Sequence, residues 1–206
     1  MIFRIHPINP QERLIQRAVE ELQAGSIMAY PTDTVYGLGC DMMSKRAVER
    51  VYQVKRMEKS KPLALLCADL SHISEYARVS DFAYRVMKHL VPGPYTFVLP
   101  ATRLVPTILE SRRRTVGIRV PSHPVPQSLI RTLGHPIVST SCDPAGVDEI
   151  MIDAEEIDGF FGNQLDFIID SGPGGLVPST VLDLTGPEVV IVREGKGPTD
   201  ALGFAV

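Results

Sequence analysis

Hydroxyl-bearing residues gather at the ends of several apolar runs in this sequence. Thr32 and Thr34 follow the run SIMAY, Ser139–Ser141 end the run HPIVSTS, and Ser179 and Thr180 begin the run STVLDLT. Such hydroxyls can simply cap the chain where it turns, or they can donate hydrogen bonds to a phosphate. One such cluster is weak evidence, but three of them favour a cleft that binds a polar ligand.

Isolated cations accompany these hydroxyls. The segment from Lys55 to Lys61, KRMEKSK, holds four cations, and is either a solvated charged turn or a set of ligands for phosphate or carboxylate. Arg119 lies inside the apolar run TVGIRVP, and a buried arginine must meet an anion, in a structural ion pair or in a ligand. Arg193 ends the run VVIVR, whereas the triplet Arg112–Arg114 is expected to be a solvated loop.

These groups suit an enzyme that holds a small anionic substrate and a nucleotide in one cleft and works by positioning and charge neutralisation. The sequence has neither a Gly-x-x-x-x-Gly-Lys-Ser/Thr loop nor a Gly-x-Gly-x-x-Gly motif after a strand. Its five histidines are scattered, so no Ser–His–Asp arrangement is indicated. The three cysteines are far apart, which indicates reduced thiols and neither a disulfide framework nor a Cys-x-x-Cys metal site.

Composition indicates one ordinary globular domain spanning residues 1–206. Apolar residues make up 44% of the chain and the net charge is −3, which argues against broad nonspecific binding of nucleic acid but allows a local basic cavity. No apolar run is long enough to span a membrane, and the N-terminal stretch has no signal-peptide core. A cytoplasmic location is therefore expected.

Apolar periodicity predicts an α/β fold with a mixed sheet. A helix is expected to start after an Asn9 cap, with Pro10 in its first position, and to stop at Gly25. A second helix begins at Ser44, with Ala47, Val48, Val51 and Tyr52 as its apolar face. Further helices are expected over 82–90, over 123–134 and near 153–162. Strands are expected within 26–31, 62–68, 95–101, 115–121, 135–141, 166–170, 179–185 and 189–194. Helices and strands alternate early and strands run together late, which favours a mixed sheet flanked by helices.

Six motifs in a fixed order resemble those of the YrdC/YciO family. They are YPTDTVYGLGCD, KPLALL, PGPYTFVLPA, GIRVPSHP, VSTS and PSTVLDL…VREG. The resemblance covers nearly the whole chain, from about Leu14 to Gly195. The whole pattern is most similar to the YciO branch. The resemblance implies a three-layer α/β fold with a strongly twisted mixed sheet around a positive cavity.

The resemblance also implies a reaction, because the best understood family members are threonylcarbamoyl-AMP synthases. These enzymes join L-threonine, bicarbonate and ATP, with magnesium accompanying the ATP, into threonylcarbamoyl-AMP and pyrophosphate. A partner complex then transfers the threonylcarbamoyl group to an adenosine next to the anticodon of certain tRNAs. ATP, L-threonine and bicarbonate are therefore the expected small-molecule partners.

The resemblance assigns roles by position. Thr34 is expected to contact L-threonine, and Arg119 to pair with its carboxylate through two parallel hydrogen bonds. Lys55 matches the lysine of the family's Lys-x-Arg motif and is the expected catalytic residue. The positions that match nucleotide or substrate contacts are Lys61, Thr115, Ser139, Ser141, Ser179 and Arg193.

Three positions depart from the family pattern. Met57 stands where the arginine of Lys-x-Arg is expected, and Leu66 stands where many members have a histidine. The Ser-x-Asn motif reads Ser141-Cys142-Asp143, and an ionised carboxylate repels a phosphate to which an amide could donate. Asp143 could instead hold a magnesium ion that bridges the phosphates.

Three functional hypotheses stay open at this stage. The first is a threonylcarbamoyl-AMP synthase or a close variant, and the second keeps the cavity but hydrolyses an acyl-adenylate. The third is an RNA-binding, translation-associated module for tRNA or double-stranded RNA, which Arg112–Arg114 could extend. Binding to RNA phosphates would weaken steeply as salt rises.

Overall fold

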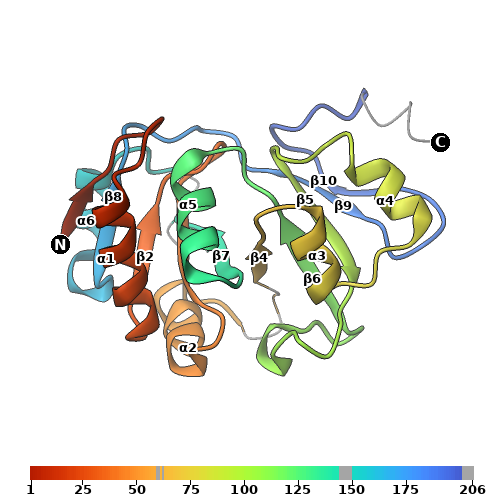
Figure 1. The fold of residues 1–206 in the computed structure, drawn as a ribbon, viewed down its shortest axis with the longest axis horizontal. Helices are drawn as coiled ribbons and strands as arrows, with labels where there is room; N and C mark the ends of the chain where they lie inside the picture. Colours follow the sequence, from red (N-terminus) through yellow and green to blue (C-terminus); the bar gives the residue numbers. More distant parts are fainter. Residues whose placement is uncertain (59–60, 62, 144–149, 201–206) are drawn as a thin grey trace.

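All strands of the described chain belong to one mixed sheet (Figure 1). The computed structural model describes residues 1–58, 61, 63–143 and 150–200. The strand order is β1-β8-β2-β3-β7-β4-β6-β5-β9-β10, with both parallel and antiparallel pairs. The strands are β1 (Ile2–Arg4), β2 (Ile27–Tyr30), β3 (Gly37–Asp41), β4 (Ala64–Leu66), β5 (Tyr95–Pro100), β6 (Thr115–Arg119), β7 (Ile137–Ser141), β8 (Phe167–Asp170), β9 (Thr180–Asp183) and β10 (Val190–Arg193).

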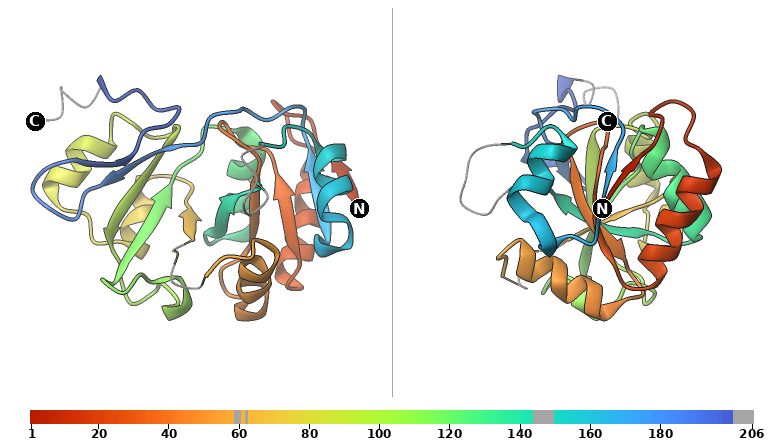
Figure 2. Two further views of the ribbon diagram at one scale, coloured as in Figure 1. Left: turned by 180° about the vertical axis from the view of Figure 1, so that it is seen from behind. Right: turned by 90° about the vertical axis from the view of Figure 1, so that its left-hand side faces the viewer.

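Helices cover both faces of this sheet, which gives three layers (Figure 2). Two helices, α1 (Glu12–Gln23) and α5 (Pro124–Leu133), lie side by side on one face, and α2 (Lys45–Val54) and α6 (Ala154–Phe161) lie on the other. The remaining helices are α3 (Leu70–Tyr76), α4 (Asp81–Met87) and the short 3-10 turns η1 (Thr107–Leu109) and η2 (Gly162–Gln164). No helix in the described ranges is long and apolar enough to cross a membrane.

Strand alternation divides the buried side chains between two cores. In β2, Ile27 and Ala29 pack with α2 and α6, whereas Met28 and Tyr30 pack with α1 and α5. The same alternation in β7 sends Val138 to the first core and its neighbours to the opposite face. Successive side chains on a strand point to opposite faces, so a sheet covered by helices on both sides needs apolar residues at consecutive positions.

Local signals predicted most helix starts correctly. The Ser44 side chain caps α2 by accepting a hydrogen bond from the Ala47 N–H, and the buried face of α2 is the expected one. The predicted start of α1 is wrong, because the helix begins at Glu12 after Gln11. Asn9 does not cap it, since its N–H donates to Nδ1 of His6, and the Gln11 side chain accepts from the His6 N–H instead.

Besides the two short 3-10 turns, three elements were not predicted: β1, α3 and the central strand β3. The stretch Gly37–Asp41 is buried at every position, yet its two glycines weaken the strand pattern. Those glycines are required by the packing, because a Cβ on Gly37 would lie 2.7 Å from the Tyr30 ring, and one on Gly39 would lie 2.9 Å from it. The second half of the motif YPTDTVYGLGCD is therefore a core strand, and its first half contains the loop between β2 and β3.

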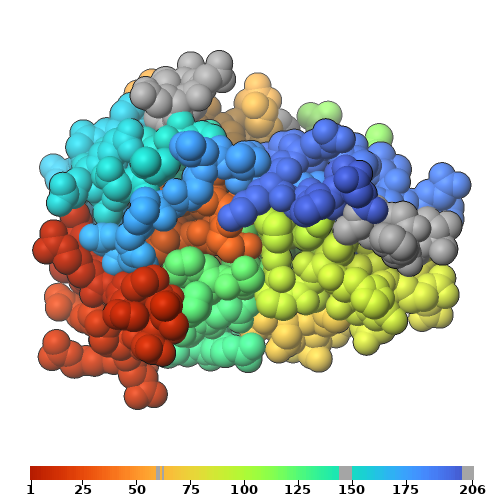
Figure 3. Space-filling model, turned by 90° about the horizontal axis from the view of Figure 1, so that it is seen from above, coloured from red at the N-terminus to blue at the C-terminus, as the bar shows by residue number. Residues whose placement is uncertain are grey.

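A long segment joins the two ends of the sheet. Residues 171–179 follow β8 and run across the molecule (Figure 3) to β9, which pairs with β5. On the way, the Gly175 N–H donates to the Thr34 carbonyl, and a side chain at position 175 would collide with that oxygen. The GPGG sequence is therefore needed for the close approach of this segment to the Thr32–Thr34 loop.

Candidate functional site

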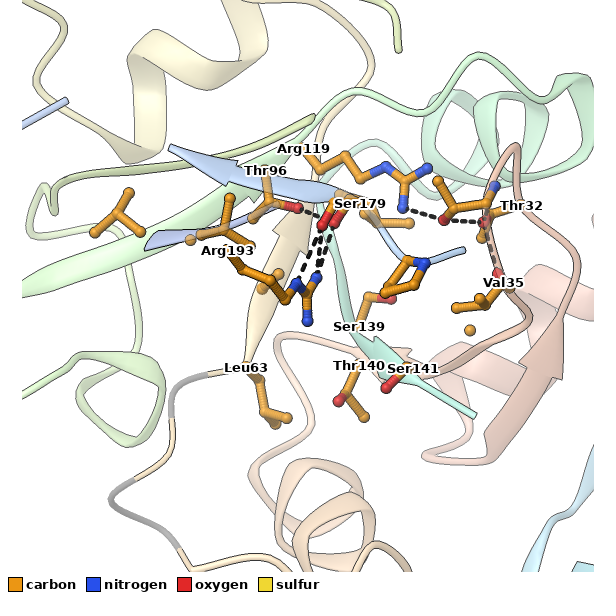
Figure 4. A pocket seen from close by; sticks show the side chains of 18 of the residues that line it. Thr32, Val35, Leu63, Thr96, Arg119, Ser139, Thr140, Ser141, Ser179 and Arg193 are labelled. Carbon is orange, nitrogen blue, oxygen red and sulfur yellow. Dashed lines mark hydrogen bonds between the residues drawn. The ribbon is translucent and has the colours of Figure 1, made fainter. Parts of the chain in front are cut away.

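A cavity of about 240 Å³ lies on the sheet face that also carries α1 and α5 (Figure 4). Ser139 and Ser141 line it because they alternate with Val138 and so continue the face of Ile137. The hydroxyl clusters expected from the sequence meet here, although they are far apart in the chain. The polar lining residues are Thr32, Thr34, Tyr36, Thr96, Thr115, Arg119, Ser139, Thr140, Ser141, Ser179 and Arg193.

Arg119 is the most buried cation of this cavity. Its residue is 7% exposed, and it reaches from β6 to the loop after β2. Nη1 donates to Oγ1 of Thr34 at 2.7 Å, and Nη2 donates to Oδ1 of Asp33 at 2.6 Å. Among the described residues, nothing accepts a hydrogen bond from its Nε. The ion pair with Asp33 holds the guanidinium in place, and its Nε–H is a buried donor without a partner among the described residues.

The Thr32–Thr34 loop is fixed by its own hydroxyls. Oγ1 of Thr32 donates to the Val35 carbonyl at 2.7 Å and accepts from the Thr34 N–H at 3.0 Å. The Oγ1 atoms of Thr32 and Thr34 lie 3.0 Å apart. Lys196, near the end of the described chain, donates its ammonium to the Asp33 carbonyl. The loop is thus organised before any ligand arrives, which reduces the entropy lost on binding.

Tyr30, in the core, contacts Ser139, one of the serines that line the cavity. The Tyr30 hydroxyl donates to Oγ of Ser139 at 2.5 Å. Complete burial raises the pKa of Tyr30, while the Ser139 hydrogen bond and the Arg119 charge oppose that shift. Tyr30 therefore stays a neutral donor, and the Ser139 hydroxyl can direct its own proton toward the cavity.

The opposite wall is built around Ser179 and Arg193. Nη2 of Arg193 donates to the Ser179 carbonyl at 2.8 Å, and Oγ of Ser179 lies 2.8 Å from Oγ1 of Thr96. Burial lowers the pKa of Arg193, the Asp143 carboxylate raises it, and the charge of Arg119 lowers it. Figure 4 shows the Arg119 guanidinium on the Thr32 side of the cavity and the Arg193 guanidinium beside Ser179, and both residues line the cavity. The cavity thus presents two guanidinium groups with hydroxyls between them.

A second cavity, of about 250 Å³, adjoins the first and shares Ser141 and Arg193 with it. Asp143 lines this second cavity, and its carboxylate lies 3.2 Å from the buried ammonium of Lys55. Burial alone would raise the pKa of Asp143, but the Ser141 hydrogen bond and the Lys55 charge lower it below its usual value. The Asp143 and Lys55 side chains therefore form an ion pair at neutral pH.

Cys142, between these residues, is not a nucleophile. It is buried and free of disulfides, as are Cys40 and Cys67. Burial raises the pKa of the Cys142 thiol to about 12, an effect that Asp143 strengthens and Lys55 weakens. A thiol needs a lowered pKa to react at neutral pH, so the hydroxyls and cations are the chemically relevant groups of the site.

The departure at Met57 has a local structural reason. Helix α2 ends with Arg56 in the left-handed region, at φ 48°, while the Arg56 N–H donates to the Gln53 carbonyl and the Met57 N–H to the Tyr52 carbonyl. This is a Schellman ending, which places an apolar residue at the position of Met57. Met57 packs against the core and Arg56 is exposed, so Arg56 does not take the place of the expected arginine.

The sequence-derived site residues are thus only partly brought together. Lys55 is paired with Asp143, which lines the second cavity. Leu66 lines the first cavity with an apolar side chain. In the described part of the chain, Lys61 is exposed and lines neither cavity. The expected residues that do line the first cavity are Thr34, Thr115, Arg119, Ser139, Ser141, Ser179 and Arg193.

Several residues of the site were not identified from the sequence. Asp33 orients Arg119, and Thr96 contacts Ser179. Asp33 belongs to the hydroxyl-rich motif, so a search for the anion required by a strand arginine could have found it. Lys196 carried no such signal.

Comparisons with known proteins agree with this geometry. The Sua5/YciO/YrdC family model, described as "Telomere recombination", matches residues 20–195. The YciO protein of Escherichia coli K12 is 44% identical over 196 residues, which is 95% of each chain. A putative threonylcarbamoyl-AMP synthase of Methanocaldococcus jannaschii is 31% identical over 98% of this chain and 96% of its own.

Solved structures give the same result. The crystal structure of E. coli YciO superposes with a TM-score of 0.94 at 43% identity, covering 98% of both chains. P. abyssi Sua5 complexed with L-threonine superposes with a TM-score of 0.92 at 30% identity, covering 100% of this chain and 61% of that one. The expected twisted α/β fold is confirmed, and the chain belongs to the Sua5/YciO/YrdC family.

Proposed function

We propose that this chain binds L-threonine and an adenine nucleotide in the Arg119 cavity and forms or processes threonylcarbamoyl-AMP. The observation that carries the proposal is Arg119 itself, a buried cation with a free Nε–H in a cavity lined by hydroxyls. A carboxylate is the ligand group that matches a fixed guanidinium. The Sua5 structure with L-threonine adds support, because it shares this fold at 30% identity.

Thr34 and Arg119 form the amino-acid end of the proposed site. Arg119 holds the carboxylate of L-threonine, and Thr34, already bonded to Nη1 of Arg119, faces the rest of the amino acid. Asp33 keeps the guanidinium oriented without occupying all of its N–H groups. The binding of the small substrate therefore depends on pre-organised groups on a strand and a short, well-fixed loop.

The remaining polar wall is proposed to hold the nucleotide. Ser139, Ser141 and Ser179 offer hydroxyl donors to phosphate oxygens, and Arg193 offers a guanidinium beside them. Thr115 lies at the outer end of the same strand face, with its Oγ1 2.6 Å from Oγ of Ser111. Two adjoining cavities give room for a ligand larger than an amino acid.

The proposed synthesis balances without a redox partner. The threonine amine attacks the bicarbonate carbon and water leaves, giving a carbamate. A carbamate oxygen then attacks the α-phosphorus of ATP, and the bond to the β,γ-pyrophosphate breaks. Arg193 and Lys55 are the cations placed to neutralise phosphate charge, although Lys55 must first exchange its Asp143 partner. Processing would use water to cleave the adenylate and release AMP.

Magnesium is proposed only as the ion that accompanies the triphosphate. Among the described residues, no group of three or more His, Cys, Asp or Glu side chains could hold a metal ion. The Asp143 carboxylate faces the Lys55 ammonium, which competes with a divalent cation for the same oxygen. The described residues therefore do not form a magnesium site of their own.

Product analysis tests the proposal. The purified chain is incubated with L-threonine, bicarbonate, ATP and magnesium, and pyrophosphate and threonylcarbamoyl-AMP are measured by chromatography. A second reaction supplies threonylcarbamoyl-AMP and follows AMP. We expect threonine-dependent pyrophosphate in the first reaction or AMP in the second, and loss of either product in Arg119→Lys but not in the exposed control Arg131→Lys. A chain that produces neither would refute the proposal.

A further inference from the structure

A second polar pocket lies away from the candidate site, at the far end of the β5–β6 hairpin. It has a volume of about 440 Å³ and is lined by Arg78, Arg103, Arg113 and Arg114. Glu110 is the one acidic residue of its described lining, so the lining carries a formal charge of +3 in a chain whose net charge is −3. The residues that line this pocket and those that line the Arg119 cavity do not overlap.

The four arginines converge from three separate segments. Arg78 follows α3 and its N–H donates to the Pro100 carbonyl at 2.8 Å. Arg103 lies in the turn after β5, where the Thr102 hydroxyl donates to the Glu75 carbonyl at 2.7 Å. Contacts between main-chain groups at the end of β5 therefore bring Arg78 and Arg103 together.

The loop before β6 holds the other two arginines. Oγ of Ser111 accepts from the Arg113 N–H at 3.2 Å and from the Thr115 N–H at 3.1 Å. The Arg114 N–H donates to the Ser111 carbonyl, and the Arg114 carbonyl accepts from the Ala101 N–H, both at 2.9 Å. The backbone of Arg113 and Arg114 is thus held by hydrogen bonds within the loop and to the residue after β5, so the Cα atoms of both arginines have fixed positions.

The charges of this pocket are not neutralised from within the described protein. No guanidinium of the four arginines has an ion-pair or hydrogen-bond partner among residues 1–58, 61, 63–143 and 150–200. All four residues are exposed. Like charges held close together repel one another, and an anion removes that repulsion. Guanidinium forks match the oxygens of phosphate groups.

We propose that this pocket binds a ligand with several phosphate groups, either the backbone of an RNA or a free oligophosphate. The hairpin links the pocket to the candidate cavity, because Thr96, Val98 and Thr115 line the cavity while Pro100 and Arg114 line the pocket. An extended polyanion in the pocket would reach the outer end of the cavity at Thr115. The proposal does not depend on threonine binding or on adenylate chemistry.

Two triple variants test it. The pocket variant carries Arg78→Gln, Arg103→Gln and Arg113→Gln, and the control carries Arg13→Gln, Arg46→Gln and Arg131→Gln, which are exposed arginines elsewhere and remove the same charge. Fluorescence anisotropy measures binding of labelled bulk tRNA, and calorimetry measures binding of tripolyphosphate, at 50 to 200 mM salt. Thermal unfolding and far-UV circular dichroism check that each variant is folded.

We expect the pocket variant to bind about tenfold or more weakly than the control, with a salt dependence of log K reduced by roughly 2 to 3 for three lost phosphate contacts. Loss of tRNA binding alone assigns the pocket to RNA, and loss of tripolyphosphate binding assigns it to a free oligophosphate. Equal affinities of the two variants for both probes would overturn the proposal. So would a wild-type chain that binds neither probe at 50 mM salt.

Discussion

The ammonium of Lys55 lies 3.2 Å from a carboxylate oxygen of Asp143 and also donates to the Asp143 carbonyl. The Lys55 side chain is 5% exposed, so water does not replace this partner easily. The two departures from the family pattern at Met57 and Asp143 therefore have different consequences. Met57 is explained by the helix ending, whereas Asp143 neutralises the lysine expected to meet phosphate.

Replacing Asp143 by asparagine should strengthen the binding of ATP. The variant Asp143→Asn removes a negative charge from the second cavity and leaves Lys55 free to meet a phosphate. We expect the dissociation constant of magnesium–ATP to fall by about tenfold, the equivalent of about 1.4 kcal/mol. Calorimetric titration measures it. The exposed control Asp158→Asn removes the same charge elsewhere, and equal affinities of the two variants would contradict the role given to Asp143.

The end of α2 should be stabilised by glycine and destabilised by restoring the family arginine. Arg56→Gly relieves a left-handed non-glycine residue and should raise the free energy of unfolding by about 0.5–1 kcal/mol. Met57→Arg places a charge against the core and should lower that free energy by about 1–3 kcal/mol.

Chemical denaturation of these variants provides the measurement. Gln16→Gly, an exposed position within α1, serves as the control and should cost about 1 kcal/mol, because its residue has an ordinary helical backbone. If Arg56→Gly destabilised the chain as much as Gln16→Gly does, the left-handed helix ending would be wrong. A Met57→Arg variant as stable as the wild type would show that position 57 accepts the family arginine.

The free energy of unfolding should decrease as the pH falls, because His123 becomes protonated. Nδ1 of His123 accepts the Val125 N–H at the start of α5, and burial lowers the pKa of His123 below 6.5 although the Asp33 charge opposes this. The unfolded chain then binds this proton more tightly than the folded chain. The stabilising contribution of neutral His123 to the free energy of unfolding is therefore fully present above pH 6.5. It is lost as the pH falls from there toward the folded-state pKa.

Denaturant unfolding between pH 5 and pH 8 measures this effect. His123→Asn keeps a capping oxygen and removes the titration, so its free energy of unfolding should fall less steeply below pH 6.5. The remaining slope should include His72, whose pKa burial also lowers. A slope in His123→Asn identical to that of the wild type would rule out His123 as a source of the pH dependence.

The sequence predicted elements whose signals are local. Helix α2 was predicted with its Ser44 cap and its buried face, because capping and periodicity involve residues within a few positions of one another. Strand β3 was missed because Gly37 and Gly39 fit the Tyr30 ring, a contact that depends on how β2 and β3 pair. Single-residue packing of that kind cannot be read from a strand's own composition.

The sequence predicted which types of residue form the site, but not which of them contact one another. The hydroxyl clusters and Arg119 were identified as binding groups, and the structure brings them to one cavity. The partners that set their charges were not identified, because Arg119 and Asp33 are 86 residues apart and Lys55 and Asp143 are 88 apart. Strand order decides which distant residues meet, and the motifs do not contain that information.

The binding of L-threonine by Arg119 tests the central claim most directly. Calorimetry would compare the wild type with Arg119→Lys, which keeps the charge opposite Asp33 but loses the fork, and with the exposed control Arg131→Lys. The account predicts saturable binding of L-threonine that weakens roughly 10- to 150-fold in Arg119→Lys, as expected for a lost charged hydrogen bond of about 1.5–3 kcal/mol, and is unchanged in the control. Equal binding by all three proteins, or no saturable binding by the wild type, would contradict it.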